Sequence, residues 1–417
     1  MRPISELLIE SLGFFPAVLL LGARQIGKST LAKELISQKI LDQYVTLDDL
    51  TTLSAFKADP DGTLASFTNR IALDEIQRVP DLMRALKKNI DENRQNGRFL
   101  LTGSTNVLSH PEVTESLTGR LDIFILEGLG IAELNNRPSP RALKILLQES
   151  VESFTNHLIQ SSKEIPPLRP ADLWEAIFFG GYPEIALAKN INFKERYFQA
   201  YQTTYIEKDV RDLSKGIDIV QFAQVAKAFF IQSGKLINFS NMANDLQLDQ
   251  RSIKRYSELL EATFQIVFLQ PWSRNTLKRI IKTPKVYAKD SGFMSFIHRV
   301  LSPENLPESS CFGEALETFV FTELRKQTQM IPGLSTYFYR THLGKEVDFV
   351  LEYGEKLIGL ELKAATSVNA KDFAGLQDLE EANQGKLELG IVLYQGTEIL
   401  PFGKNKLAVP LKYFLFA

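Results

Sequence analysis

The sequence predicts an α/β protein whose first third folds into a parallel sheet covered by helices. Short apolar runs alternate there with amphipathic stretches that have helical periodicity. The runs are residues 17–21, 44–47, 71–73, 99–102 and 121–126. Apolar strands separated by helices are typical of a parallel sheet that is buried on both faces. After this part, the pattern predicts a helical region and then a second α/β region.

The length and the charge balance limit the classes of protein that fit. A chain of 417 residues is too long for one hydrophobic core, so about two to four domains are expected. Hydrophobic residues make up 44% and charged residues 24%, as in ordinary globular proteins. Because the formal net charge is −2, any nucleic-acid site must be a local basic patch.

The cysteine, histidine and hydropathy patterns indicate a cytoplasmic protein. Cys311 is the only cysteine and the four histidines are scattered, so neither disulfides nor a zinc site is predicted. Apolar runs such as residues 17–21 are too short to span a bilayer. We therefore expect a soluble, cytoplasmic chain without a membrane partner.

Shifts in composition predict three domains. Prolines cluster between residues 135 and 170, as expected of a connection that leaves the first domain. Residues 173–297 have mostly helical periodicity, and from residue 313 a helical pattern is followed by strand patterns. The predicted domains are residues 1–135, 136–305 and 306–417.

A phosphate-binding motif follows the first strand. Gly22, Gly27, Lys28 and Ser29 have the spacing G-x4-G-K-S between an apolar strand and a helical pattern. The glycines let backbone N–H groups surround phosphates, the lysine reaches the terminal phosphates, and the serine ligates Mg²⁺. The motif predicts a nucleotide site that includes the adjacent Thr30.

Polar side chains at the ends of two later strands complete this site. Asp74 and Glu75 follow the strand at residues 71–73, at the strand end where ligands bind in parallel α/β sheets. We expect Asp74 to hold the Mg²⁺ shell and Glu75 to orient the attacking water. Three polar residues at the end of another strand are candidates for sensing the γ-phosphate, and the sequence does not choose among them: Thr102, Ser104 and Asn106.

Two arginines are candidates for a residue that acts on the nucleotide of a neighbouring subunit. Such an arginine neutralises transition-state charge in phosphoryl transfer. Arg120, just before the strand at residues 121–126, is the first candidate, and Arg211 on a charged helical segment is the second. A surface arginine or a local ion pair is the alternative for each. A role in trans requires a homo-oligomer.

The middle region resembles a winged helix-turn-helix with a basic face. A short helix is predicted at residues 242–246 and a second at 250–261. Residues 251–289 contain nine basic and two acidic residues, a net charge of 9 − 2 = +7: Arg251, Lys254, Arg255, Arg274, Lys278, Arg279, Lys282, Lys285 and Lys289, against Glu258 and Glu261. This segment could contact DNA phosphates without reading sequence. The alternative is a packing module with a solvated basic edge.

The segment from Gly344 to Thr366 predicts a β-hairpin with a polar face. Gly354 and Glu355 form a two-residue turn of the Gly-X type. In a hairpin centred on this turn, the residue numbers of two directly opposite residues add up to 354 + 355 = 709. Asp348 then lies opposite Glu361. By the same rule Glu346 lies opposite Lys363, whereas Val347, Phe349 and Leu351 point with Leu360 and Leu362 to an apolar face.

Two carboxylates directly opposite one another repel unless a cation lies between them. A divalent metal bound by Asp348 and Glu361 would remove the repulsion, and Lys363 would position the nucleophilic water or stabilise the developing charge. Glu317, from a preceding helical pattern, could complete the metal site. The alternative is a hairpin with a Glu346–Lys363 ion pair and carboxylates that face water.

The combined motifs resemble a known family. They are "GARQIGKST", "ALDEIQ", "LLTGST", "ESLTGR", "GGYPE", "YIEKDVRDL", "PKVYAKDSG", "ETFVFTELRKQ" and "EVDFVLE" with "GLELKA". Across nearly the whole chain the sequence looks like the prokaryotic AAA-type ATPases that join a P-loop NTPase domain to a winged-helix region and a C-terminal restriction-endonuclease-like domain. The stretch "LEGLGIAEL" departs from the more polar loop of that family.

The resemblance implies ATP binding by Gly27, Lys28, Ser29, Asp74 and Glu75. It also implies a nuclease-type core made of Asp348, Glu361 and Lys363.

Two functions fit the sequence. The first is ATP hydrolysis that drives or gates a DNA-associated module, for which a metal-dependent nuclease is one form. The alternative is a nucleotide-switched protein-interaction scaffold with an inactive endonuclease-like domain.

Overall fold

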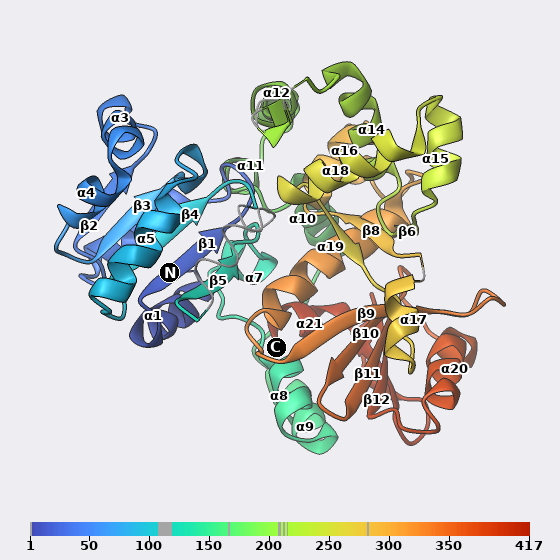
Figure 1. Cartoon of the computed structure of the whole chain (residues 1–417). Coiled ribbons are helices and arrows are strands. Elements are labelled where there is room, and N and C mark those ends of the chain that lie inside the picture. Colours follow the sequence, from blue (N-terminus) through green and yellow to red (C-terminus); the bar gives the residue numbers. More distant parts are fainter. Residues whose placement is uncertain are drawn as a thin grey trace. The chain divides into compact units, whose positions relative to one another are not determined.

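The computed structural model describes residues 2–106, 119–165, 167–206, 210–211, 213–214, 216–281 and 283–417 (Figure 1). The chain divides into two compact units. Unit 1 comprises Met1–Gly128, Ala200–Ile219 and Glu258–Gln265, and unit 2 comprises Leu129–Gln199, Val220–Ser257 and Ile266–Ala417. Within the described ranges, no helix is long and apolar enough to cross a membrane.

Unit 1 is built on a five-stranded parallel sheet with the order β2-β3-β4-β1-β5. The strands are β1 (Ala17–Leu21), β2 (Gln43–Thr46), β3 (Ile71–Asp74), β4 (Phe99–Gly103) and β5 (Leu121–Ile125). Its helices include α1 (Ile4–Phe14), α2 (Lys28–Ser37), α3 (Leu50–Ala58), α4 (Pro60–Ala65) and α5 (Leu82–Glu92). The predicted parallel sheet is confirmed, and each strand ends within one residue of its predicted bounds.

The strand order brings three strand ends together. Strand β4 lies between β1 and β3, and because all strands run the same way, their carboxyl ends share one edge of the sheet. Every residue of β1, β3 and β4 is buried, as expected of strands covered on both faces. The rigid edge that results positions the predicted nucleotide site.

The first part of unit 2 is mainly helical. Its helices include α7 (Ile131–Leu134), α8 (Ala142–Gln148), α9 (Val151–Ser161), α10 (Pro170–Phe179), α11 (Pro183–Ala188), α12 (Ile191–Tyr201), α14 (Ile219–Ile231), α15 (Phe239–Leu246), α16 (Gln250–Ala262), α17 (Thr276–Ile281) and α18 (Ser291–Ile297). The last residues of α12 and α16 and the first residue of α14 are grouped with unit 1. A small antiparallel sheet has the order β6-β8-β7, with β6 (Lys235–Leu236), β7 (Ile266–Leu269) and β8 (Lys285–Ala288).

Two expectations about this region change. The proline-rich stretch is not a simple connection, because α8 and α9 form within it and Pro170 begins α10, where its missing N–H costs nothing. The first helix of the predicted helix-turn-helix begins at Phe239 rather than at residue 242, since the Asn238 side chain caps it by accepting a bond from Asn241 N.

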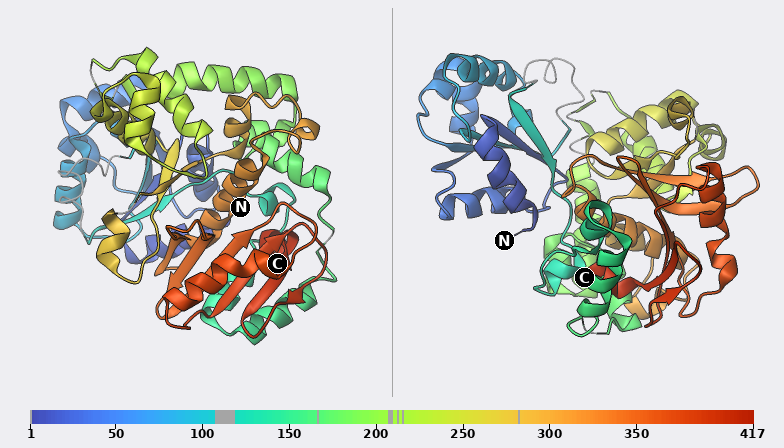
Figure 2. Two further views of the ribbon diagram at one scale, coloured as in Figure 1. Left: turned by 90° about the vertical axis from the view of Figure 1, so that its right-hand side faces the viewer. Right: turned by 90° about the horizontal axis from the view of Figure 1, so that it is seen from below.

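The C-terminal part of unit 2 holds a six-stranded mixed sheet with the order β13-β14-β12-β11-β10-β9 (Figure 2, orange to red). The strands are β9 (Leu334–Arg340), β10 (Glu346–Tyr353), β11 (Lys356–Leu362), β12 (Leu389–Tyr394), β13 (Leu400–Pro401) and β14 (Lys406–Pro410). The helices are α19 (Phe312–Thr328), α20 (Ala374–Ala382) and α21 (Leu411–Phe416). Strands β9, β10 and β11 are antiparallel neighbours, whereas β12 runs parallel to β11.

The two sheets of unit 2 are joined through the chain that follows β7. Phe338 in β9 donates its backbone N–H to Gln270 O at 3.1 Å and accepts from Trp272 N at 2.5 Å. Trp272 is buried in the same apolar cluster as Val350 and Leu376 of the C-terminal part. The two compact units combine most of the second and third predicted domains into unit 2. The division into three domains therefore remains a prediction.

Candidate functional site

The phosphate-binding loop has the backbone that the motif predicts. Gly22 has φ +152°, and a Cβ there would lie 2.6 Å from Leu126 O, so only glycine fits. Gly27 has φ +103° and precedes the first residue of α2. The Lys28 ammonium is buried and donates to Gly22 O at 2.9 Å and Ala23 O at 2.8 Å. It therefore lies inside the loop, where a phosphate would bind.

Side chains from α2, β4 and β2 meet at Asp74, the last residue of β3. Ser29 Oγ donates to Asp74 Oδ2 at 2.8 Å, and Thr102 Oγ1 donates to the other carboxylate oxygen. Thr102 reaches Asp74 because β4 is the parallel neighbour of β3, with Leu73 paired to Leu101. The Tyr44 hydroxyl, from β2, also donates to Asp74. Burial, and then the Asp74 carboxylate, raises the pKa of Tyr44 to about 12.

Glu75 lies just past the end of β3 in a left-handed conformation, with φ 61° and ψ 45°. This conformation is uncommon outside glycine and is found at functional sites. Gln77 Nε2 donates to the Glu75 carboxylate and to Ser104 Oγ at 2.8 Å. Ser104 Oγ donates to Glu75 Oε2 at 3.2 Å. The structure thus separates the sensor candidates: Thr102 contacts Asp74 and Ser104 contacts Glu75.

The remaining predicted residues of this site lie further out. Thr30 is exposed on α2, and the half-buried Asn106 donates its backbone N–H to Ala262 O at 2.7 Å.

Three residues of this site were not predicted. Tyr44 and Gln77 could have been found as polar side chains beside strand ends, but Arg2 gave no signal in the sequence. Arg2 donates to Ile26 O at 3.3 Å in the loop and to the carbonyl oxygens of Glu127 and Gly128 at 2.8 and 3.0 Å.

The two candidate arginines lie away from this edge. Arg120 donates to Asp91 through Nε at 2.6 Å and Nη2 at 3.0 Å, which is the local ion pair of the alternative interpretation. Its carbonyl accepts from Ala17 N, at the amino end of β1 and opposite the loop. Arg120 therefore cannot reach the nucleotide site of its own chain. Arg211 is exposed.

The residues of unit 1 fit a nucleotide with Mg²⁺. The glycine conformations leave room for backbone N–H groups to face phosphate oxygens. The hydroxyl of Ser29 already lies beside the Asp74 carboxylate, and hydroxyl and carboxylate oxygens are suitable Mg²⁺ ligands or hydrogen-bond partners of its waters.

The predicted hairpin forms in unit 2 with the predicted register. Phe349 pairs with Leu360 and Tyr353 with Lys356, both of which sum to 709. Gly354 has φ +59° at the turn. Asp348, Glu361, Lys363 and Glu317 line one pocket of about 510 Å³.

The four residues predicted to share a polar face, Glu346, Asp348, Glu361 and Lys363, line one pocket, but the predicted alternation along β10 is wrong. Val347 and Val350 are fully buried in the same cluster, although alternation places them on opposite faces. A bulge in the pairing of β10 with β9, between these two residues, explains the difference, because the inserted residue changes which side chains share a face.

The cation beside the carboxylates is Lys285 of β8. Its ammonium lies 2.8 Å from Glu317 Oε1, 2.5 Å from Glu346 Oε1 and 3.8 Å from Asp348 Oδ1. Lys363 pairs with Glu361 at 2.8 Å, so the expected Glu346–Lys363 pair is replaced. Among the described residues, no group of three His, Cys, Asp or Glu side chains is arranged to hold a metal. Metal binding by Asp348 and Glu361 remains a prediction.

Burial and charge shift the pKa values of this pocket. Burial raises the pKa of Asp348 well above its usual range, the charges of Glu317 and Glu361 raise it further, and Lys285 opposes them. Burial also raises the pKa of Glu361, against the effect of Lys363. Burial alone would lower the pKa of Lys285, but the surrounding carboxylates outweigh it and raise that pKa.

The basic segment does not form one exposed face. Arg279 makes a bidentate ion pair with Glu352, and Lys285 is buried. Lys282 and the side chain of Lys278 lie outside the described residues. The described basic side chains that are exposed are Arg251, Lys254, Arg255 and Arg274.

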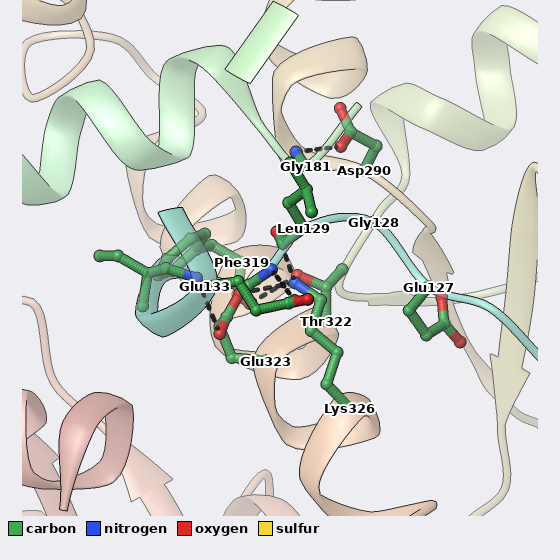
Figure 3. Close-up of polar contacts among 12 residues, drawn as sticks. Glu127, Gly128, Leu129, Glu133, Gly181, Asp290, Phe319, Thr322, Glu323 and Lys326 are labelled. Carbon is green, nitrogen blue, oxygen red and sulfur yellow. Dashed lines mark hydrogen bonds and ion pairs between the residues drawn. The ribbon is translucent and has the colours of Figure 1, made fainter. Parts of the chain in front are cut away.

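The segment after β5 is fixed within unit 2 (Figure 3). Leu129 N donates to Gly181 O at 2.7 Å, and Leu129 O accepts from Lys326 Nζ at 3.1 Å. Gly181 N in turn donates to the buried Asp290 carboxylate at 2.7 Å. Ile131 N donates to Glu323 Oε2 at 3.3 Å. The stretch "LEGLGIAEL" departs from the more polar loop of the family that the sequence resembles. Its residues from Leu129 onward are held in place by these hydrogen bonds.

Comparison with known proteins identifies the class of unit 1. Residues 15–135 match a family described as an AAA domain. Residues 170–304 and 312–414 match two families that are each described as a domain of unknown function. The match, the parallel sheet, the loop and Asp74 together support an AAA-type P-loop ATPase domain in the N-terminal part.

Three relatives that match most of the chain are described as uncharacterized proteins. Uncharacterized proteins of Mycobacterium tuberculosis and Mycobacterium bovis are each 26% identical over 401 residues, which cover 95% of this chain and 80% of the relative. An uncharacterized protein of Methanocaldococcus jannaschii is 24% identical over 80% of this chain and 71% of its own. A Walker-type ATPase structure from Pyrococcus abyssi covers 70% of this chain and 94% of its own at 13% identity and a TM-score of 0.42, too low to support an argument.

Proposed function

We propose that the chain binds ATP with Mg²⁺ and hydrolyses it at the edge of the sheet of unit 1. The observation that carries the proposal is the convergence of α2 and β4 on Asp74 at the end of β3, with Ser29 Oγ on one carboxylate oxygen and Thr102 Oγ1 on the other. A phosphate-binding lysine, a magnesium-ligating hydroxyl and an acidic residue are thereby brought together.

Each residue has a distinct role in this proposal. Bound Mg²⁺ would neutralise charge on the β- and γ-phosphates. Lys28 binds the terminal phosphates when it leaves the loop carbonyls, and Asp74 orients Ser29 and the waters around the ion. Glu75 accepts a hydrogen bond from the attacking water and orients it, and Gln77 and Ser104 hold Glu75 in its left-handed conformation.

Replacing Lys28 tests nucleotide binding. Lys28→Ala should weaken ATP binding, measured with a fluorescent ATP analogue, because it removes the cation from the loop. Lys57→Ala, at an exposed position of α3, is the matched control and should bind as the wild type does. Equal affinity in all three proteins would remove the assignment.

We further propose that unit 2 is the module that this nucleotide cycle controls. The element order α19-β9-β10-β11-α20-β12 and the shared pocket of Asp348, Glu361 and Lys363 support an endonuclease-like ancestry. The buried Lys285 in the carboxylate pocket favours the scaffold alternative over a nuclease that is assembled for cleavage.

A DNA contact, if present, should involve α16. We expect reversal of three exposed basic side chains to weaken DNA binding for all sequences and to reduce the dependence of affinity on salt, because phosphate contacts release counterions. The residues are Arg251, Lys254 and Arg255. The matched control reverses three exposed basic residues of α5: Arg84, Lys87 and Lys88. Unchanged binding and salt dependence would leave α16 as a packing element.

A further inference from the structure

A lysine from the helical region is the cation of the C-terminal carboxylate pocket. Lys285 lies in the region matched at residues 170–304, whereas Glu317, Glu346 and Asp348 lie in the region matched at 312–414. The Lys285 side chain is only 2% exposed. Carboxylates this close require a cation in a buried setting. The protein supplies that cation from a separate part of unit 2.

One oxygen of the pocket lacks a hydrogen-bond partner. Glu361 is 9% exposed, and its Oε2 is buried without a donor, whereas its Oε1 accepts from Lys363 Nζ. A buried carboxylate oxygen without a partner is costly in a folded protein. The unpartnered oxygen points to a second cation-binding arrangement of the same pocket.

The charges of the pocket agree with two alternative cations. Glu317, Glu346, Asp348 and Glu361 carry four formal negative charges, and Lys285, Lys363 and Arg340 carry three positive charges, a sum of −1. Binding of a dication to this pocket would change its net charge from −1 to +1. Without the charge of Lys285 the net charge of the pocket is −2, which one dication neutralises. Lys285 and a divalent metal are therefore competing rather than cooperating cations.

We propose that Lys285 acts as a built-in competitor of divalent metal in this pocket. While its ammonium lies among Glu317, Glu346 and Asp348, the pocket does not take a dication. Once the ammonium is removed or withdrawn, Asp348 and Glu361 bind one. The competition is independent of ATP hydrolysis.

The experiment measures Mn²⁺ binding to the full chain by isothermal titration calorimetry without nucleotide. Lys285→Met removes the charge and retains much of the volume, so we expect one Mn²⁺ site at least about 100-fold tighter than any site of the wild type, equivalent to about 2.8 kcal/mol. The double variant K285M/E361Q should lose that site. Lys235→Met, at an exposed lysine of the rim that pairs with Glu314, should behave as the wild type.

A second variant keeps the test valid if K285M does not fold. Lys285→Gln removes the same charge, retains a hydrogen-bond donor for the buried carboxylates and preserves both proposed ligands, and circular dichroism verifies its fold. A new Mn²⁺ site in this protein supports the competition. The proposal is overturned if the wild type binds Mn²⁺ as tightly as K285M, or if folded K285Q gains no site.

Discussion

Replacing Arg279 with alanine should destabilise unit 2 by about 2 to 4 kcal/mol. The guanidinium donates to Glu352 Oε2 at 2.6 Å, Glu352 Oε1 at 2.8 Å and Ser273 O at 2.6 Å. It also lies over the rings of Tyr337 and Trp272, at 4.7 and 5.6 Å. Arg279 is therefore a structural residue rather than a free phosphate contact.

The magnitude follows from these contacts. Charge-assisted hydrogen bonds contribute about 1.5 to 3 kcal/mol, and the ring contacts about 0.5 to 1 kcal/mol. The Arg279 side chain is only 12% exposed, so water screens the pair less than a surface ion pair. Arg279→Lys should lose part of this free energy, because an ammonium cannot make the bidentate pair.

Tryptophan fluorescence measures the stability of unit 2 selectively. The chain has two tryptophans, Trp174 and Trp272, and both belong to unit 2. Denaturant unfolding followed by this signal should show the loss for Arg279→Ala. The control Arg274→Ala, at an exposed neighbouring position, should stay within about 0.5 kcal/mol of the wild type.

The effect should depend on pH in a defined direction. The Arg279 guanidinium holds the pKa of Glu352 below its ordinary value of 4.5, against the opposite effect of burial. Because the pKa of Glu352 is lower in the folded than in the unfolded protein, its ionised carboxylate stabilises the folded state at pH values above the unfolded pKa. This contribution to the free energy of unfolding is lost as the pH falls through the folded pKa. The difference between wild type and Arg279→Ala should therefore be full at pH 7 and shrink below about pH 4.5. Equal unfolding free energies at pH 7 would refute the structural role of the ion pair.

Three further predictions concern unit 1. Gly22→Ala should abolish ATP binding in a titration with a fluorescent analogue, because its Cβ would lie 2.6 Å from Leu126 O. Tyr44→Phe should leave the pH profile of ATP hydrolysis unchanged between pH 7 and 10, since the pKa of this phenol is about 12, but should raise the Mg²⁺ concentration required, through loss of the bond to Asp74. If Arg120 acts on the nucleotide of a neighbouring subunit, Arg120→Ala should reduce the hydrolysis rate only at protein concentrations where the chain self-associates. A reduced hydrolysis rate of the monomeric variant would contradict that role.

Local chemistry made the sheet of unit 1 and the hairpin register predictable. Strands buried on both faces consist mainly of apolar residues. The strands at residues 17–21 and 99–102 could therefore be predicted without knowing which strands pair with them. The turn at Gly354 fixed the pairing of Phe349 with Leu360, because a hairpin register depends only on its turn.

Features that depend on distant residues could not be predicted. The bulge between Val347 and Val350 arises in the pairing with β9, which the hairpin sequence does not encode. The sequence pattern groups Lys285 with the basic residues of a possible DNA-binding face. Its partners Glu317 and Glu346 lie far along the chain, so its burial among them could not be predicted. Arg2 reaches the phosphate-binding loop only through the fold. The roles of the individual site residues remain predictions.

The central claim is that Asp74 and Glu75 make unit 1 an ATPase, and Glu75→Gln tests it most directly. Hydrolysis should be measured by phosphate release, and ATP affinity by titration of the same preparations. We expect the variant to bind ATP as the wild type does, because amide and carboxylate have nearly the same shape, and to hydrolyse it at least about 100-fold more slowly. A variant that hydrolyses ATP at the wild-type rate, or a wild type that binds ATP without hydrolysing it, would contradict the account.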